Sequence, residues 1–146
     1  MHGYKAHVAT DEAGGLVRSV EITTANVHDG IMLDAVLPSD PGEVYADSAY
    51  AADRFTKVIR DRGGVARVVY TSTWGGPAAL ARLEAWNAEV RAVRCRIEKV
   101  FGTWKRSYGL RRMRWRGLAK AGLQVRLTAM AYNLRRTMLL VRAQAT

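Results

Sequence analysis

Two short segments near the N-terminus alternate between apolar and polar residues, the period of a β-strand with one buried face. In residues 3–10 every second position from Tyr4 to Val8 is apolar, and residues 16–23 repeat the alternation. The connector 11–15 reads DEAGG and supplies the glycines that a tight turn needs. The pattern therefore predicts a β-hairpin.

The next part of the chain alternates between helical and strand patterns. Residues 31–37 predict a short helix, 44–46 a short strand, 51–62 an amphipathic helix and 65–70 a β-branched strand. Two strands separated by a helix are expected to be parallel neighbours. We therefore predict an α/β fold whose mixed sheet contains the hairpin and two parallel strands.

Long helical patterns fill the C-terminal half. A helix is predicted from residue 78 at least to residue 105, interrupted by Gly109, and a second helix over residues 118–142. The apolar stripe of the first helix consists of Leu83, Trp86, Val90, Val93, Ile97, Val100, Phe101 and Trp104. We expect one domain over residues 1–146, with a sheet portion at 1–77 and a basic helical portion at 78–146.

Charge separates the two parts of the chain and points to a partner. Residues 1–90 carry 8 basic and 12 acidic side chains, whereas residues 91–146 carry 15 basic side chains and 1 acidic one. Such asymmetry favours a polyanionic partner, with nucleic acid the leading candidate. A basic face kept only for solubility is the alternative.

Composition limits the other classes of protein. With 49% hydrophobic residues and a length of 146, the chain can bury a core. Cys95 is the only cysteine, which excludes an internal disulfide framework and fits a reducing cytoplasm. No apolar run is long enough for a membrane span, so we expect a cytoplasmic protein without a membrane partner.

Two carboxylates stand out as candidates for chemistry. Asp47 follows the strand 44–46, and functional groups collect at the C-terminal ends of strands in open α/β sheets. Capping of a helix that begins near Tyr50 is the alternative role for Asp47. Glu98 is the single acid in the basic region, and Arg94, Glu98 and Lys105 lie within about 40° of one another on a helix. An ordinary i, i+4 Arg–Glu pair is the alternative there.

Several blocks of sequence carry a family resemblance. They are GYKAHVATDEAGGLVRSVEITTANVHD, VYADSAY, RCRIEKVFGTWKRSYGLRRMRWRGL and AMAYNLRR, in this order. The chain resembles the C-terminal part of bacterial DDE transposases of the group typified by insertion sequences four and five. Arg94, Glu98 and Lys105 match that family's Tyr-x2-Arg-x3-Glu-x6-Lys signature, but Arg91 stands at the tyrosine position.

The resemblance implies a ribonuclease-H-like fold and a chemistry. It implies that Asp47 is the second catalytic aspartate and Glu98 the catalytic glutamate, and that both bind Mg²⁺ (or Mn²⁺). Double-stranded DNA at transposon ends is the implied substrate, for phosphodiester hydrolysis and strand transfer. The basic residues expected to hold DNA are Arg94, Lys105, Arg106, Arg111, Arg112, Arg114 and Arg116.

The first catalytic aspartate of that family has no counterpart that we identify in these residues. Asp11 lies in the predicted hairpin turn and Asp29 opens a helix, so neither is a good substitute. We therefore expect a partial ribonuclease-H-like fold that is inactive alone. It should be marginally stable, form homo-oligomers, or need an upstream transposase polypeptide. His28, Asp29 and Asn133 lie in matching blocks but receive no assigned role.

Two other functions also fit the sequence. The chain could be a non-catalytic DNA-binding remnant of a transposase, in which Glu98 is dispensable. It could also be a small basic RNA-binding protein. That reading gives no reason for Asp47 at the end of a strand, so we rank it last.

Overall fold

The computed structural model describes residues 3–145, which divide into two compact units. One unit contains the chain up to His28 and again from Ile97 onward, and the other contains Asp29–Arg96. The helix α3 (Gly76–Ser107) contributes to both units.

The first unit is built on a hairpin of β1 (Tyr4–Thr10) and β2 (Val17–Thr24). The strands are antiparallel, and Val8 is paired with Val20. The turn between them is held by Asp11, whose Oδ1 accepts hydrogen bonds from the backbone N–H groups of Gly14 and Leu16 at 2.7 and 3.3 Å. An aspartate that bonds the backbone a few residues on is a common way to fix a turn.

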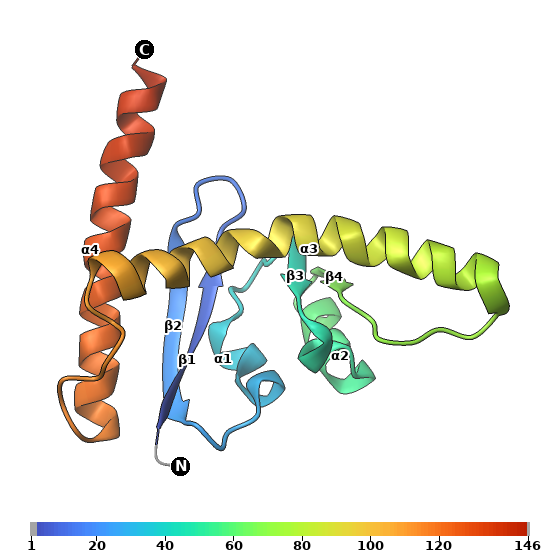
Figure 1. Ribbon diagram of the computed structural model, residues 1–146, viewed down its shortest axis with the longest axis horizontal. Coiled ribbons are helices and arrows are strands. Elements are labelled where there is room, and N and C mark those ends of the chain that lie inside the picture. The colour runs from blue at the N-terminus through green and yellow to red at the C-terminus, as the bar shows by residue number, and fades with distance from the viewer. Residues whose placement is uncertain (1–2, 146) are drawn as a thin grey trace. The chain divides into compact units, whose positions relative to one another are not determined.

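The last helix, α4 (Leu118–Gln144), runs beside β2, as Figure 1 shows. Three of its side chains bond the hairpin backbone. The Tyr132 hydroxyl donates to the Gly15 carbonyl at 3.1 Å, Arg136 Nε donates to Gly14 at 2.7 Å, and Asn133 bonds β2. Its opposite face exposes several apolar side chains, namely Leu123, Leu127, Met130, Leu134, Met138 and Val141.

The core of the first unit lies between the hairpin, α4 and the C-terminal part of α3. Its buried residues are Val17, Ile22, Val100, Trp104, Val125 and Ala129. Trp104 is fully buried and makes edge-to-face contacts with Phe101 and Tyr132, at centroid distances of 5.6 and 6.4 Å. Such aromatic pairs add to the stabilisation from buried area. The C-terminal part of the apolar stripe predicted on α3, from Val100 to Trp104, is confirmed here.

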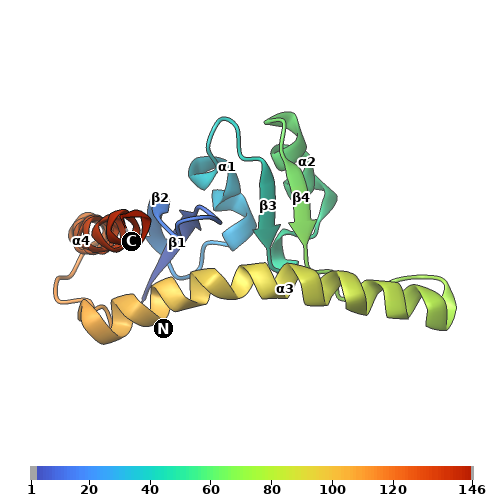
Figure 2. The ribbon, with the colours of Figure 1, turned by 90° about the horizontal axis from the view of Figure 1, so that it is seen from above.

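The second unit contains the parallel strands β3 (Glu43–Ala46) and β4 (Val65–Val68). They lie side by side in Figure 2, and α2 (Asp53–Asp61) connects them. The strand pair is preceded by the 3-10 helix η1 (Asp29–Met32) and the short helix α1 (Leu33–Val36), and η2 (Ser48–Tyr50) follows β3. Leu33, Phe55 and Ile59 form the buried core.

Gly30 is required by the close packing of this core. A Cβ atom added at Gly30 would lie 2.3 Å from the Phe55 ring, which is well below van der Waals contact. Only glycine leaves room for the ring at this position. The packing of η1 on α2 therefore depends on the absence of a side chain.

The N-terminal part of α3 packs on β4. Trp86 Nε1 donates to the Val68 carbonyl at 2.8 Å. The Asn87 side chain accepts from the Tyr70 N–H at 3.0 Å and donates to the Tyr70 carbonyl at 2.7 Å. Buried backbone groups need such partners, so Asn87 extends the ordered backbone beyond the end of the strand.

The predicted α/β class, with a hairpin, a parallel strand pair and long C-terminal helices, is confirmed and is consistent with a partial ribonuclease-H-like fold. The strands of the described residues form two two-stranded sheets, one antiparallel and one parallel. The predicted single mixed sheet is not observed among these residues, because backbone pairing stays within the hairpin and within the parallel pair. The helix predicted at 31–37 is divided into η1 and α1, and the long helix begins at Gly76 rather than at residue 78.

Candidate functional site

Asp47 lies directly after β3, at the C-terminal edge of the parallel strand pair. Its Oδ1 accepts a hydrogen bond from the Ala49 N–H at 3.0 Å, which makes Asp47 the N-cap of η2. The capping role considered for Asp47 is thus observed, on a 3-10 helix that begins at Ser48. This bond uses one carboxylate oxygen and fixes the direction of the other.

Arg94 of α3 faces that second oxygen. Its Nη1 lies 4.0 Å from Asp47 Oδ2, and the two side chains are 30% and 44% exposed. The distance is at the outer limit of an ion pair, so the two groups interact mainly through charge. A half-exposed carboxylate beside a guanidinium is a suitable place for a phosphate group or a cation to approach.

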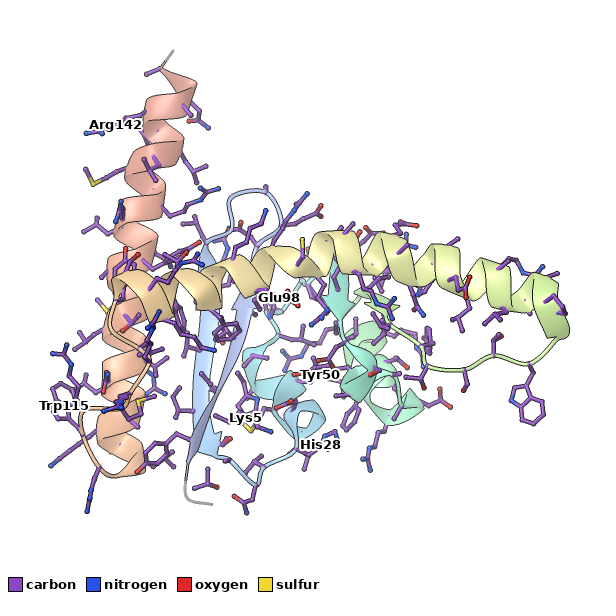
Figure 3. All side chains as sticks on the ribbon, in the orientation of Figure 1. Lys5, His28, Tyr50, Glu98, Trp115 and Arg142 are labelled. Carbon is purple, nitrogen blue, oxygen red and sulfur yellow. The ribbon has the colours of Figure 1, made fainter. Side chains whose placement is uncertain are left out.

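Tyr50 adds a neutral hydroxyl to the surroundings of Asp47 (Figure 3). Burial, with the nearby carboxylates of Asp29 and Asp47, raises the pKa of Tyr50 to about 12. The phenol therefore stays protonated near neutral pH and can donate a hydrogen bond. Tyr50 and Asp29 had no predicted chemical role. Nothing in the sequence around Tyr50 indicates that the carboxylates of Asp29 and Asp47 both raise its pKa.

Glu98 belongs to the first unit and is exposed on α3, one helical turn after Arg94 (Figure 3). Lys105 and Arg106 follow on the same helix, and both are exposed. Phe101, three residues later and on a neighbouring face of the helix, is partly buried against the core of this unit, so Glu98 borders the packed side of the helix. Its carboxylate is accessible and has the chemistry of a hard-cation ligand.

The predicted DNA-binding arginines of the loop after α3 are exposed. They are Arg111, Arg112, Arg114 and Arg116. Trp115, between the last two, is 43% exposed (Figure 3). A run of guanidinium groups with an exposed aromatic side chain is typical of nucleic-acid contact surfaces. The structure thus gathers these side chains on one loop of the first unit.

A pocket of about 410 Å³ lies beyond the C-terminal end of β4, in the second unit. Its walls are formed by Tyr70, Thr71, Leu80, Leu83, Glu84, Asn87 and Arg91. The sequence predicted no role for Arg91. It stands where the signature Tyr-x2-Arg-x3-Glu-x6-Lys has its tyrosine, and no other feature of the sequence distinguishes it. The Val69 N–H bonds the Ala46 carbonyl at 3.2 Å, so this pocket and Asp47 share the same edge of the strand pair.

The donor chemistry fits a divalent cation only in part. Asp47 and Glu98 offer carboxylate oxygens, which Mg²⁺ and Mn²⁺ prefer. Among residues 3–145, no group of three or more His, Cys, Asp and Glu side chains is arranged to hold a metal ion. The two carboxylates are therefore suitable ligands, each described within its own unit.

Comparison with protein families identifies the chain. The sequence model of the family described as Transposase DDE domain matches residues 1–134. The chain belongs to this family. The predicted resemblance to DDE transposases is confirmed. Transposase DDE domains have nuclease activity related to transposition, generally depend on divalent metals and generally bind DNA at transposon ends.

No solved structure matches the chain. Within residues 3–145, none of the helices is both long enough and apolar enough to cross a membrane.

Proposed function

We propose that this chain is the C-terminal catalytic part of a DNA transposase that hydrolyses phosphodiester bonds and transfers strands at transposon ends. The observation that carries the proposal is the position of Asp47. Asp47 directly follows β3, and its Oδ2 lies 4.0 Å from Nη1 of Arg94. Arg94 belongs to α3, and Glu98 follows four residues later on the same helix. Asp47 and Glu98 are the two carboxylates to which the resemblance assigns catalysis, and Arg94 is a cationic side chain that can bind the DNA backbone.

We propose that Asp47 and Glu98 are ligands of Mg²⁺ (or Mn²⁺). When bound, such ions activate water or a 3′-hydroxyl and stabilise the leaving oxygen of an in-line displacement. Asp47 would contribute through Oδ2, because Oδ1 is held by the Ala49 N–H. A ligand whose direction is fixed before the metal arrives loses less conformational freedom on binding.

The basic side chains would neutralise and orient DNA. Arg94 is placed to bind a phosphate beside Asp47, and Lys105 and Arg106 continue along α3. The arginines of the loop after α3 would bind phosphates farther along the duplex. Phosphate contacts of this kind fix the register of a protein on DNA and contribute most of its non-specific affinity.

Two carboxylates are few for a two-metal site, so activity should require a third ligand. We propose that residues 1–146 are part of one ribonuclease-H-like domain, and that a strand with an additional aspartate completes the active site. An upstream transposase polypeptide or a homo-oligomer could supply it. Without it, the 146 residues should bind DNA but not cleave it.

Metal binding and cleavage test the proposal separately. Mn²⁺ binding is measured by electron paramagnetic resonance on the chain and on Asp47→Asn, Glu98→Gln and Asp61→Asn. Asp61 is an exposed acid on α2, paired with Lys57, and serves as the matched control. We expect the first two variants to lower Mn²⁺ affinity and the control to leave it unchanged.

Cleavage is measured with the chain fused behind a segment that supplies a first strand and its aspartate. We expect nicking of transposon-end DNA that Glu98→Gln abolishes. Robust Mg²⁺-dependent nicking by the 146 residues alone would contradict the need for a third carboxylate. Equal Mn²⁺ affinity in all variants would contradict the ligand roles.

A non-catalytic DNA-binding remnant is the second candidate function. The exposed arginine loop favours it, because that loop lies in the first unit and could bind DNA without any metal. In that case Glu98→Gln should leave DNA affinity intact or slightly higher, since it removes a negative charge. The fusion experiment would then show no metal-dependent cleavage.

A further inference from the structure

The loop between α3 and α4 is anchored at both ends and at positions between them. At its start, the Leu110 N–H donates to the Trp104 carbonyl at 3.1 Å, past Gly109, which has a positive φ of 69°. At its end, the Gly117 N–H donates to the Tyr4 hydroxyl at 2.8 Å. Leu110 and Met113 pack against the core of the first unit. Both ends and the interior are therefore anchored.

Gln124 of α4 holds the middle of this loop. Its Oε1 accepts a hydrogen bond from the Arg114 N–H at 2.9 Å, and its Nε2 donates to the Arg112 carbonyl at 3.4 Å. The two bonds flank Met113, which is turned toward the core. One amide side chain thus fixes the backbone on both sides of an inward residue, and Arg112 and Arg114 remain exposed.

This anchoring acts against the charge repulsion within the segment. Residues 111–116 contain four arginines and no acid, and like charges in a free loop would repel and extend it. Ordering a flexible segment on binding reduces affinity, whereas a segment already fixed in its binding conformation avoids that loss. The hydrogen bonds of Gln124 and Tyr4 provide this order before any ligand is present.

We propose that Gln124 is a positioning residue that preorganises the arginine loop 111–116 to bind the phosphate backbone of duplex DNA. This inference rests on the proposed DNA-binding function. It adds that the affinity for duplex DNA depends on the amide of Gln124 as well as on the number of arginines. Tyr4 supports the same loop from β1 through Gly117. Trp115 stands between Arg114 and Arg116 in the sequence and is 43% exposed, so it can extend the contact surface.

Salt dependence distinguishes positioning from direct contact. The slope of log K for DNA binding against log salt is negative. Removing a residue that binds one phosphate makes this slope shallower by about 0.9. A residue that only orders the loop lowers the affinity at every salt concentration and leaves the slope unchanged. The two roles therefore give different results in one titration.

The experiment measures binding of a fluorescent duplex of random sequence to the full chain between 50 and 250 mM salt. Gln124→Met removes both hydrogen bonds at nearly constant volume, and we expect about 10-fold weaker binding with an unchanged slope. Gln144→Met is the matched control, since Gln144 is an exposed glutamine on the same helix, and it should match the wild type. Arg112→Ala and Arg114→Ala should each lower the slope.

Hydrogen exchange at the Arg114 amide tests the anchoring without DNA. Exchange should become faster in Gln124→Met and stay unchanged in Gln144→Met. If Gln124→Met unfolds, Tyr4→Phe replaces it, because it removes only the acceptor of Gly117. We expect it to weaken binding about 5-fold with an unchanged slope.

The outcomes separate this inference from the proposed function. Wild-type affinity in Gln124→Met, or a reduced slope in that variant, would overturn the positioning role while DNA binding stands. No binding by the wild type, or no effect of Arg112→Ala and Arg114→Ala together, would overturn the DNA-binding role of the loop itself.

Discussion

The guanidinium of Arg94 lies 4.0 Å from Oδ2 of Asp47, and the other oxygen of the same carboxylate caps η2 through the Ala49 N–H at 3.0 Å. One side chain therefore has a structural role through Oδ1 and an electrostatic relationship through Oδ2. Because the cap uses Oδ1 and the charge interaction uses Oδ2, substitutions of Asp47 can remove one role and keep the other.

Asp47→Asn should preserve the fold, and Asp47→Ala should destabilise it. Asparagine retains a side-chain oxygen that can accept the Ala49 N–H, whereas alanine loses the cap, which costs about 1 kcal/mol. Both variants should lose Mn²⁺ affinity, because neither has a carboxylate. Urea unfolding followed by circular dichroism measures the stability. Equal destabilisation by the two substitutions would show that the cap contributes little.

Arg94→Ala should weaken DNA binding and lower its salt dependence. If Arg94 binds one phosphate, its loss reduces the slope of log K against log salt by about 0.9. Arg94→Lys should keep most of the slope but bind less tightly, since lysine lacks the planar fork that matches a phosphate. Arg82→Ala, an exposed position earlier on α3, is the control. Identical titrations for Arg94→Ala and Arg82→Ala would remove Arg94 from the DNA-binding surface.

Local pattern was sufficient to predict most elements of this fold. The alternation around Tyr4 and Val20 predicted the hairpin, and the apolar stripe through Trp104 predicted α3, because both follow from the period of a regular backbone. Asp47 could be placed at a strand end for the same reason. These features depend on residues close together in the sequence.

Contacts between distant residues could not be predicted in this way. Asn133 bonds the backbone of Val17, which is 116 residues away, and nothing in the sequence around either residue indicates the pair. The bond from Gln124 to Arg114 likewise depends on how α4 packs after the loop closes. The acidic surroundings of Tyr50 depend on η1 and η2 meeting in space.

Tyr50 should ionise only at high pH, with a pKa of about 12, because burial and the carboxylates of Asp29 and Asp47 disfavour the phenolate. An unfolded tyrosine ionises near pH 10. The folded state therefore holds its proton more tightly, and the stabilisation from Tyr50 is complete below about pH 10 and is lost as the pH rises toward about 12. Unfolding of the chain and of Tyr50→Phe across this range measures the effect.

The difference in stability between the wild type and Tyr50→Phe should shrink through this pH window. Absorbance at 295 nm follows the ionisation directly, and Asp47→Asn should lower the pKa of Tyr50 because it removes one nearby negative charge. Asp53→Asn, an exposed acid at the start of α2, is the control. A pKa near 10 for Tyr50 in the wild type would contradict the buried, acidic environment.

Asn133→Ala should destabilise the first unit without changing the DNA contacts. Its amide accepts from the Val17 N–H and donates to the Val17 carbonyl, both at 2.8 Å, and Val17 is buried. Removing the amide leaves two backbone groups of β2 without these partners, which costs about 2–3 kcal/mol. Asn26→Ala, at an exposed turn position, should change stability by less than about 0.5 kcal/mol. Denaturant unfolding compares the two variants. Unchanged stability of Asn133→Ala, together with a shallower slope of log K for DNA binding against log salt, would instead make Asn133 a DNA contact. A residue that joins α4 to β2 affects folding, whereas a residue that binds phosphate affects the release of counterions from DNA.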